Sequence, residues 1–202
     1  MKKKIVIVGG VAGGATALAR LRRLDEELEI VLFERGEHVS FANCGLPYYI
    51  GDTIKSRDAL LLQTPKSLSD KFNADVRNFS EVLEILPDEK MLKVKNLQTN
   101  ETYTESYDDL ILSTGSTPLR PSIPNIDKEN IFSLWNVKDT DKIKNYINDN
   151  NPKSATVIGG GFIGIEMAEN LKELGLDVSL VEMANQVMAP LDFEMAEIVH
   201  DT

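Results

Sequence analysis

Cysteine, histidine and long hydrophobic runs are all scarce in this sequence. No apolar run approaches the roughly 20 residues that a membrane-spanning helix needs. One cysteine cannot form an intrachain disulfide, which excludes a disulfide-stapled secreted scaffold and favours a reducing, cytoplasmic location. His38 and His200 have no cysteine or acidic residue at metal-ligand spacing. We therefore predict no metal site and expect both histidines on the surface.

Positive charge is also in the minority. The 202 residues carry 22 Lys and Arg against 32 Asp and Glu, a net charge of -10 that repels a phosphate backbone. We expect no nucleic-acid partner and no membrane partner, although a local basic patch could bind a small anionic ligand. Hydrophobic residues make up 42% of the chain, enough to build the core of one or two domains.

The first 33 residues predict a βαβ unit. Residues 4–8 and 29–33 are β-branched runs typical of buried parallel strands, and residues 15–24 place apolar side chains at helical spacing. Four glycines lie between the first strand and the helix. The basic and apolar start, with Ala-Leu-Ala before Arg20, also resembles a signal peptide. The glycines and the Arg-rich helical pattern favour the βαβ unit.

The same pattern returns about 150 residues later. A strand at 155–158, a glycine loop, a helix at 162–174 ending at Gly175, and a strand at 177–181 are predicted. The segment in between predicts an antiparallel meander over about 81–107, a strand at 109–112, and a helix at 138–147. Prolines 118, 121 and 124 mark a stiff connector.

These elements predict an α/β protein with two Rossmann-like dinucleotide-binding units. We expect a first domain at 1–118, a connector and helix at 119–150, and a second domain at 151–202. A helix that begins at 191 is cut short, and a dinucleotide-binding half needs a further strand. We therefore expect the second unit to be incomplete and the chain to be a fragment of a longer protein.

Each glycine loop carries the pattern of a dinucleotide site. Gly159, Gly161 and Gly164 are followed 18 residues later by Glu182. The first loop has Gly9 and Gly14 at the outer positions, Val11 in the middle, and Glu34 as the acid. Such glycines let the backbone approach a pyrophosphate at the helix N-terminus, and the acid accepts the ribose hydroxyls. One loop alone could be an ordinary tight turn, whereas two copies with acids predict dinucleotides.

Glu182 also bears on the choice of nicotinamide cofactor. A carboxylate beside the ribose repels a 2′-phosphate, so we expect NADH in preference to NADPH unless a neighbouring cation overrides the repulsion.

Cys44 lies in the run SFANCGLPYY. A lone cysteine is often a small buried hydrophobe. Here Ser40 and Asn43 are cap-type residues, and Pro47 suits the first turn of a helix that begins near Cys44. A helix N-terminus favours the thiolate, which is the redox-active form. With no second cysteine, we expect any disulfide of Cys44 to involve another molecule.

Four motifs in this order resemble those of the FAD-dependent pyridine nucleotide-disulfide oxidoreductases. They are GGVAGG at 9–14, SFANCGLPYY at 40–49, YDDLILSTGSTP at 107–118 and GGGFIGIE at 159–166. The set is most similar to the single-cysteine branch, which contains coenzyme A-disulfide reductases, NADH oxidases and NADH peroxidases. Residues 43–47 most resemble the coenzyme A-disulfide reductases, including forms fused to a rhodanese domain.

The resemblance implies an FAD/NAD(P)-binding fold with three groups of binding residues. It implies FAD contacts from Gly9, Val11, Ala12, Gly13, Gly14, Glu34, Arg35, Val82, Thr114 and Gly115. It implies NAD(P)H contacts from Gly159, Gly161, Phe162, Ile163, Gly164 and Glu182. It implies coenzyme A contacts from Thr16, Arg20, Arg23, Ser40 and Asn43, although the two arginines could instead form a solvated face. A distal FAD segment and a C-terminal dimer domain of the family are missing, and the full-length protein is expected to be a homodimer.

The resemblance also implies an activity. NADH or NADPH would reduce coenzyme A disulfide, or a coenzyme A persulfide or polysulfide, through FAD and the catalytic Cys44. An NADH oxidase or peroxidase that cycles through a Cys44 sulfenic acid is an alternative within the enzyme class. An inactive, truncated flavin-binding fragment is the alternative outside it.

Overall fold

The computed structural model describes residues 2–201 and divides into two compact units. Unit 1 contains Met1–Ala42 and Leu61–Thr117, and unit 2 contains Asn43–Leu60 and Pro118–Thr202. The segment Asn43–Leu60, which carries the only cysteine, thus belongs with the second half of the chain. Hydrophobic patterning did not predict this grouping, because it depends on contacts distant in sequence.

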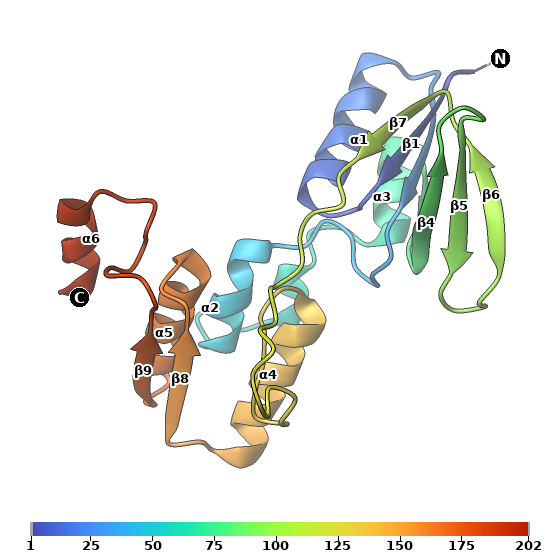
Figure 1. The fold of residues 1–202 in the computed structure, drawn as a ribbon. Coiled ribbons are helices and arrows are strands. Elements are labelled where there is room, and N and C mark those ends of the chain that lie inside the picture. The colour runs from blue at the N-terminus through green and yellow to red at the C-terminus, as the bar shows by residue number, and fades with distance from the viewer. Residues whose placement is uncertain (1, 202) are drawn as a thin grey trace. The chain divides into compact units, whose positions relative to one another are not determined.

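Unit 1 is built on a four-stranded parallel sheet in the order β3-β2-β1-β7 (Figure 1). The strands are β1 (Lys4–Val8), β2 (Glu29–Phe33), β3 (Asp75–Arg77) and β7 (Asp109–Leu112). β1 pairs with β2 on one side and with β7 on the other. The carboxyl ends of these strands therefore meet at one edge of the sheet, where open α/β sheets bind ligands.

The parallel sheet of unit 1 is covered on both faces (Figure 1). Ile7 and Leu32 pack in a core with α1 (Ala12–Leu24) and α3 (Pro65–Phe72). Val6 and Phe33 pack in a second core with the antiparallel meander. The meander consists of β4 (Ser80–Leu86), β5 (Met91–Asn96) and β6 (Thr102–Ser106). Burial on both faces explains why β1 and β2 are continuous apolar runs.

Unit 2 contains a two-stranded parallel sheet and a cluster of helices. In chain order its elements are the 3-10 turn η1 (Asn43–Gly45), α2 (Leu46–Ile50), the 3-10 turn η2 (Arg57–Leu60), α4 (Val137–Asn150), β8 (Ser154–Ile158), α5 (Phe162–Glu173), β9 (Asp177–Val181) and α6 (Phe193–His200). One core joins Ile50 of α2, Ile143 of α4, and Met167 and Leu171 of α5. The Cys44 segment is therefore an integral part of this unit.

The predicted α/β class is confirmed, and most of the predicted elements are present. α1 begins at Ala12 rather than at residue 15, because Gly13 and Gly14 are already helical. The helix α3, the three-residue β3 and the 3-10 turn η2 were not predicted. α3 begins at a capping box in which Thr64 and Ser67 exchange hydrogen bonds, a signal that lies in polar residues rather than in apolar spacing. No helix among residues 2–201 is long and apolar enough to cross a bilayer.

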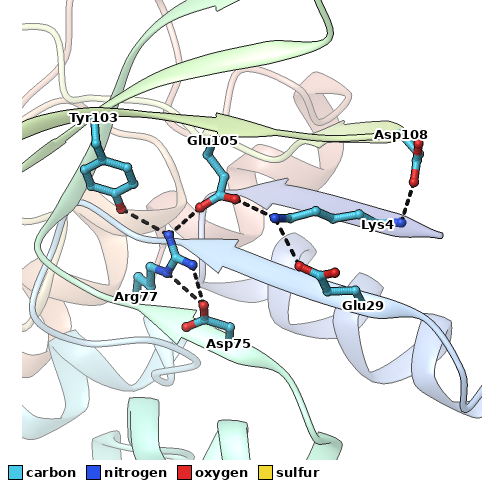
Figure 2. Close-up of polar contacts among 7 residues, drawn as sticks. All are labelled: Lys4, Glu29, Asp75, Arg77, Tyr103, Glu105 and Asp108. Carbon is cyan, nitrogen blue, oxygen red and sulfur yellow. Dashed lines mark hydrogen bonds and ion pairs between the residues drawn. The ribbon is translucent and has the colours of Figure 1, made fainter. Parts of the chain in front are cut away.

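A network of charged side chains connects the meander to the parallel sheet (Figure 2). The Glu105 carboxylate of β6 accepts hydrogen bonds from Lys4 of β1 and from Arg77 of β3. Arg77 also pairs with Asp75, and Lys4 also pairs with Glu29. Burial opposes the charge of Glu105, whose side chain is 12% exposed, but the two cations outweigh burial and lower its pKa.

We predict that Glu105→Ala destabilises unit 1 by about 2 kcal/mol, because it leaves two partly buried cations without a shared partner. Urea denaturation followed by circular dichroism measures this change. Glu101→Ala is the matched control, since Glu101 is exposed just before β6 and a surface substitution is expected to change stability by about 0.5 kcal/mol or less. Equal effects of the two substitutions would contradict the stabilising role of the network.

Candidate functional site

The two glycine loops have the same backbone geometry. Gly9 and Gly159 both adopt left-handed backbone conformations, with φ of 102° and 105°. The N–H of Gly9 donates to the carbonyl of Phe33 at 2.8 Å, and the N–H of Gly159 donates to that of Val181, also at 2.8 Å. Each loop is therefore fixed to the end of the neighbouring strand, and the first glycine of each motif is needed for its backbone conformation.

The third glycine of each motif is required by close packing. A Cβ atom on Gly14 would lie 1.7 Å from the carbonyl oxygen of Gly9, and one on Gly164 would lie 1.9 Å from that of Gly159. Separations this short are impossible, so only glycine lets helix and loop approach this closely. The middle positions differ, because Val11 stands in the first loop (loop 1, residues 9–14) where the second loop (loop 2, residues 159–164) has Gly161. A Cβ on Gly161 would meet no atom within 4 Å.

The N-termini of α1 and α5 have no side-chain cap. Val11 and Gly161 occupy their N-cap positions without a capping hydrogen bond, whereas Thr64 caps α3 and Asn136 caps α4. The first-turn N–H groups of an uncapped helix, together with its dipole, attract an anion such as a pyrophosphate. Phe162 and Ile163 in the first turn of α5 are exposed apolar residues.

Each predicted acid is held by two backbone N–H groups. The Glu34 carboxylate accepts from Gly10 at 2.8 Å and from Gly36 at 2.7 Å. The Glu182 carboxylate accepts from Gly160 at 2.6 Å and from Ala184 at 2.7 Å. We call this arrangement the acid clamp. Every carboxylate oxygen retains acceptor capacity for a ribose hydroxyl.

Gly10 and Gly160 contact the two acids, a role that the sequence analysis did not predict. Gly10 directly follows Gly9, and Gly160 directly follows Gly159. This regularity of the two loops was visible in the sequence. A Cβ on Gly10 would meet the Cβ of Glu34 at 3.0 Å, and a Cβ on Gly160 would meet Oε2 of Glu182 at 3.2 Å. Glycine therefore allows each acid to approach its loop closely.

The repeat extends beyond the acids. The N–H of Ser40 donates to the Gly10 carbonyl at 3.0 Å, and the N–H of Met188 donates to the Gly160 carbonyl at 2.7 Å. Both residues adopt left-handed conformations, with φ of 47° and 52°. Our interpretation of Ser40 as a cap-type residue before the Cys44 helix was therefore wrong, because Ser40 is a turn residue that closes loop 1.

The remaining FAD candidates also belong to unit 1. Thr114 and Gly115 are exposed residues after the carboxyl end of β7, and a Cβ on Gly9 would lie 3.3 Å from the Thr114 nitrogen. Ala12 and Gly13 are exposed in the first turn of α1, Arg35 is exposed after Glu34, and Val82 lies in β4 against the meander core. The loop, the acid and Thr114 thus follow the carboxyl ends of three adjacent strands.

Cys44 is an exposed free thiol in η1, directly before α2. The predicted helix start is confirmed, including Pro47 in its first turn, but neither Ser40 nor Asn43 caps it. α2 has only five residues, so its dipole is weaker than the sequence argument assumed. Nearby, the Glu166 carboxylate raises the pKa of Tyr48, with further contributions from burial and from Glu169, Cys44 and Glu173.

The coenzyme A candidates fall in both units. Thr16, Arg20 and Arg23 lie on the exposed face of α1, and no described residue pairs with either arginine. Arg22 instead points to the protein and donates to five backbone carbonyls, including those of Phe72 and Leu28. Ser40 belongs to unit 1, whereas Asn43 is exposed in unit 2 beside Cys44 in the chain.

The two histidines have different environments. His200 is exposed, as predicted, and its Nε2 accepts the N–H of Val187 at 3.2 Å. The prediction for His38 was wrong, because its side chain is only 17% exposed and lies 3.9 Å from the Glu37 carboxylate. Across residues 2–201, no group of three or more His, Cys, Asp or Glu side chains is arranged to hold a metal ion.

The acid clamp predicts a pH dependence of stability. The N–H groups of Ala184 and Gly160 lower the pKa of Glu182 below its ordinary value of 4.5. A lowered carboxyl pKa stabilises the fold fully above the unfolded value, and this contribution is lost as the pH falls through the folded value. The difference in Tm between wild type and Glu182→Gln should therefore be constant above pH 4.5 and shrink below it. Exposed Glu197→Gln is the control, and a difference that grows toward acid would contradict the clamp.

Comparisons with known proteins agree with this geometry. A coenzyme A disulfide reductase of Staphylococcus haemolyticus is 41% identical over 199 residues, which is 98% of this chain and 44% of that protein. The crystal structure of reduced Bacillus anthracis CoADR-RHD is 60% identical with a TM-score of 0.95, over 100% of this chain and 36% of that one. An NAD-dependent persulfide reductase from A. fulgidus is 34% identical with a TM-score of 0.92, over 98% of this chain and 37% of that one.

The chain therefore spans less than half the length of these relatives. Residues 3–202 match the model of a single family throughout. By this match, and by the two glycine loops with their acid clamps, the chain belongs to the pyridine nucleotide-disulphide oxidoreductase family.

Proposed function

We propose that this chain supplies the nucleotide-binding units and the reactive thiol of a flavoprotein that uses NADH to reduce coenzyme A disulfide. The observation that carries the proposal is the repeated acid clamp, which gives one chain two similar nucleotide sites. Reduction of a disulfide substrate requires a sulfur nucleophile. The exposed thiol of Cys44 is the only thiol in this sequence. The names of the most similar relatives support the same substrate class.

Unit 1 fits FAD. The N-terminus of α1 has no side-chain cap, so its first-turn N–H groups are available to the pyrophosphate of a dinucleotide. The α1 N-terminus would bind the pyrophosphate of FAD, Glu34 would accept the ribose hydroxyls, and Thr114-Gly115, Arg35 and Val82 would contribute the remaining contacts. Bound FAD would supply the two-electron transfer that connects a nicotinamide cofactor to a thiol.

Unit 2 fits a nicotinamide dinucleotide. The α5 N-terminus would bind the pyrophosphate through Gly161, Phe162, Ile163 and Gly164, and Glu182 would bind the adenine ribose. The clamp keeps Glu182 ionised, because both of its N–H partners lower its pKa. A fixed negative charge at this position disfavours the 2′-phosphate of NADPH, so the cofactor is NADH.

The chemistry at Cys44 begins with thiol–disulfide exchange. The Cys44 thiolate attacks one sulfur of coenzyme A disulfide, a Cys44–coenzyme A disulfide forms, and the departing thiolate takes a proton from solvent. The complete reaction converts NADH, one proton and coenzyme A disulfide into NAD⁺ and two coenzyme A thiols. Arg20 and Arg23 lie three residues apart on the exposed face of α1 and have no described partner, which suits them to bind the phosphates of coenzyme A.

We propose that the complete protein is a homodimer, as the family resemblance implies, and that it acts in the cytoplasm. An unpaired, exposed thiol that must return to its reduced form suits a reducing compartment.

Binding of NADH tests the nicotinamide site. We predict that Gly161→Ala weakens NADH binding about tenfold, or about 1.4 kcal/mol, because its Cβ meets no protein atom and only obstructs the ligand. Its Tm should stay close to that of wild type. Gly164→Ala is the contrasting variant and should disrupt unit 2, since its Cβ overlaps the Gly159 carbonyl. Fluorescence titration measures binding, and unchanged NADH affinity in folded Gly161→Ala would contradict the site.

Mass spectrometry after exposure to coenzyme A disulfide tests the thiol chemistry. We expect a coenzyme A adduct on Cys44 in wild type, its release on addition of NADH and FAD, and no adduct in Cys44→Ser. Arg20→Ala together with Arg23→Ala should slow adduct formation about tenfold, by loss of two charge-assisted contacts. A Cys44 that accumulates as sulfenic acid with oxygen or peroxide would instead indicate an oxidase or peroxidase. An unreactive Cys44 would contradict an enzymatic role for the chain.

A further inference from the structure

The segment that carries Cys44 is fastened to unit 2 by contacts at the end of α2. Lys144 of α4, whose side chain is 13% exposed, donates to the carbonyl oxygens of Tyr49 and Ile50 and to the carboxylate of Asp52. Arg57 forms a two-pronged ion pair with Asp141 of α4. These contacts hold one side of the segment to α4.

A single buried amide holds the other side of the segment to α5. Asn170 is 1% exposed, and its Nδ2 donates to the Glu166 carbonyl at 2.7 Å. Gly51, which ends α2, lies directly against it. A Cβ on Gly51 would come within 2.3 Å of Asn170 Oδ1 and 2.6 Å of Asn170 Cβ. Glycine is therefore required at position 51 because the α2 backbone rests on the Asn170 side chain.

Asn170 is chemically unusual for this position. Its Oδ1 is buried and accepts no hydrogen bond from any described residue. An unsatisfied buried acceptor is destabilising by about 1–3 kcal/mol. A leucine of similar shape would fill the same space without that penalty. Packing alone therefore does not explain why an asparagine stands at position 170. The hydrogen bond from its side-chain amide to the Glu166 carbonyl fixes the orientation of the side chain that Gly51 contacts.

We propose that Asn170 is a positioning residue for Cys44. Through Gly51 it fixes α2, and thereby η1 and the thiol, on the helix whose N-terminus forms the nicotinamide site. The inference rests on the proposed function, in which Cys44 attacks a large disulfide that must meet the thiol at a defined angle. Small misplacements of a reacting group slow such reactions strongly.

Amide hydrogen exchange tests the positioning without any substrate. In Asn170→Ala we expect the Gly51 amide, which donates to the Pro47 carbonyl, to exchange about tenfold faster than in wild type, because α2 loses its support. The amides of β8 and β9 should change far less. Thr140→Ala is the matched control, since Thr140 is a fully buried polar residue of α4 in the same unit. Equal acceleration at Gly51 in both variants would overturn the proposal.

The reactivity of Cys44 tests the consequence for chemistry. Iodoacetamide is small and needs only an exposed thiol, whereas coenzyme A disulfide needs a positioned one. The ratio of the two rate constants, disulfide over iodoacetamide, should fall about tenfold in Asn170→Ala and stay near wild type in Thr140→Ala. Asn170→Gln, which restores the amide but is longer, should not rescue the ratio. An unchanged ratio in Asn170→Ala would overturn the role of Asn170 in positioning.

The two measurements separate this inference from the proposed function. If wild-type Cys44 alkylates normally but never forms a coenzyme A adduct, the proposed substrate is wrong. Hydrogen exchange at Gly51 then still decides whether Asn170 fixes the segment.

Discussion

The close approach of a helix N-terminus to the end of a strand is the constraint on which both halves of this chain depend. In each half, the carbonyl oxygen of the first loop glycine occupies the space where a side chain of the third glycine would lie. The first-turn N–H groups at this approach have no side-chain cap. The approach also brings Gly10 to Glu34 in the first loop and Gly160 to Glu182 in the second. One steric condition, the close approach of the helix to its loop, therefore fixes the positions of the loop, the helix terminus and the carboxylate. The same condition applies in both halves of the chain.

The acid clamp gives the carboxylates a double role. Each one organises its own loop through two backbone N–H groups, and each keeps lone pairs for a ribose. A site preorganised in this way does not need to order its acid when the nucleotide binds. In the proposed nicotinamide site the same negative charge would disfavour a phosphorylated ribose, so Glu182 would serve folding, binding and selectivity.

Much of the fold could be predicted from the sequence because its strongest signals are local. β1 and β2 have the predicted bounds, since buried parallel strands are short apolar runs bounded by glycine and charged residues. β9 also has the predicted bounds, although its residues alternate between exposed and partly buried. The glycine pattern located the two loops, and the resemblance to a family implied the roles of their residues and of Cys44. β3 escaped prediction because three residues, Asp75–Arg77, carry no periodic pattern.

Other features depend on contacts that no local pattern contains. The grouping of Asn43–Leu60 with unit 2 follows from packing of Ile50 with α4 and α5, residues that are distant in the chain. The sequence does not distinguish Arg22 from its neighbours Arg20 and Arg23. Arg22 donates hydrogen bonds to backbone carbonyls, whereas the other two arginines have no partner among the described residues. Asn170 gave no signal, because an asparagine within a helix usually indicates a solvated position.

We propose that the two clamped loops are separate nucleotide sites with different ligands. Amide NMR spectra of the ¹⁵N-labelled chain, recorded during separate titrations with FAD and NADH, can distinguish the two sites. We expect FAD to shift the Gly10 and Gly36 signals and NADH to shift those of Gly160 and Ala184. Shifts of one pair by both ligands, or of neither pair by either ligand, would contradict it.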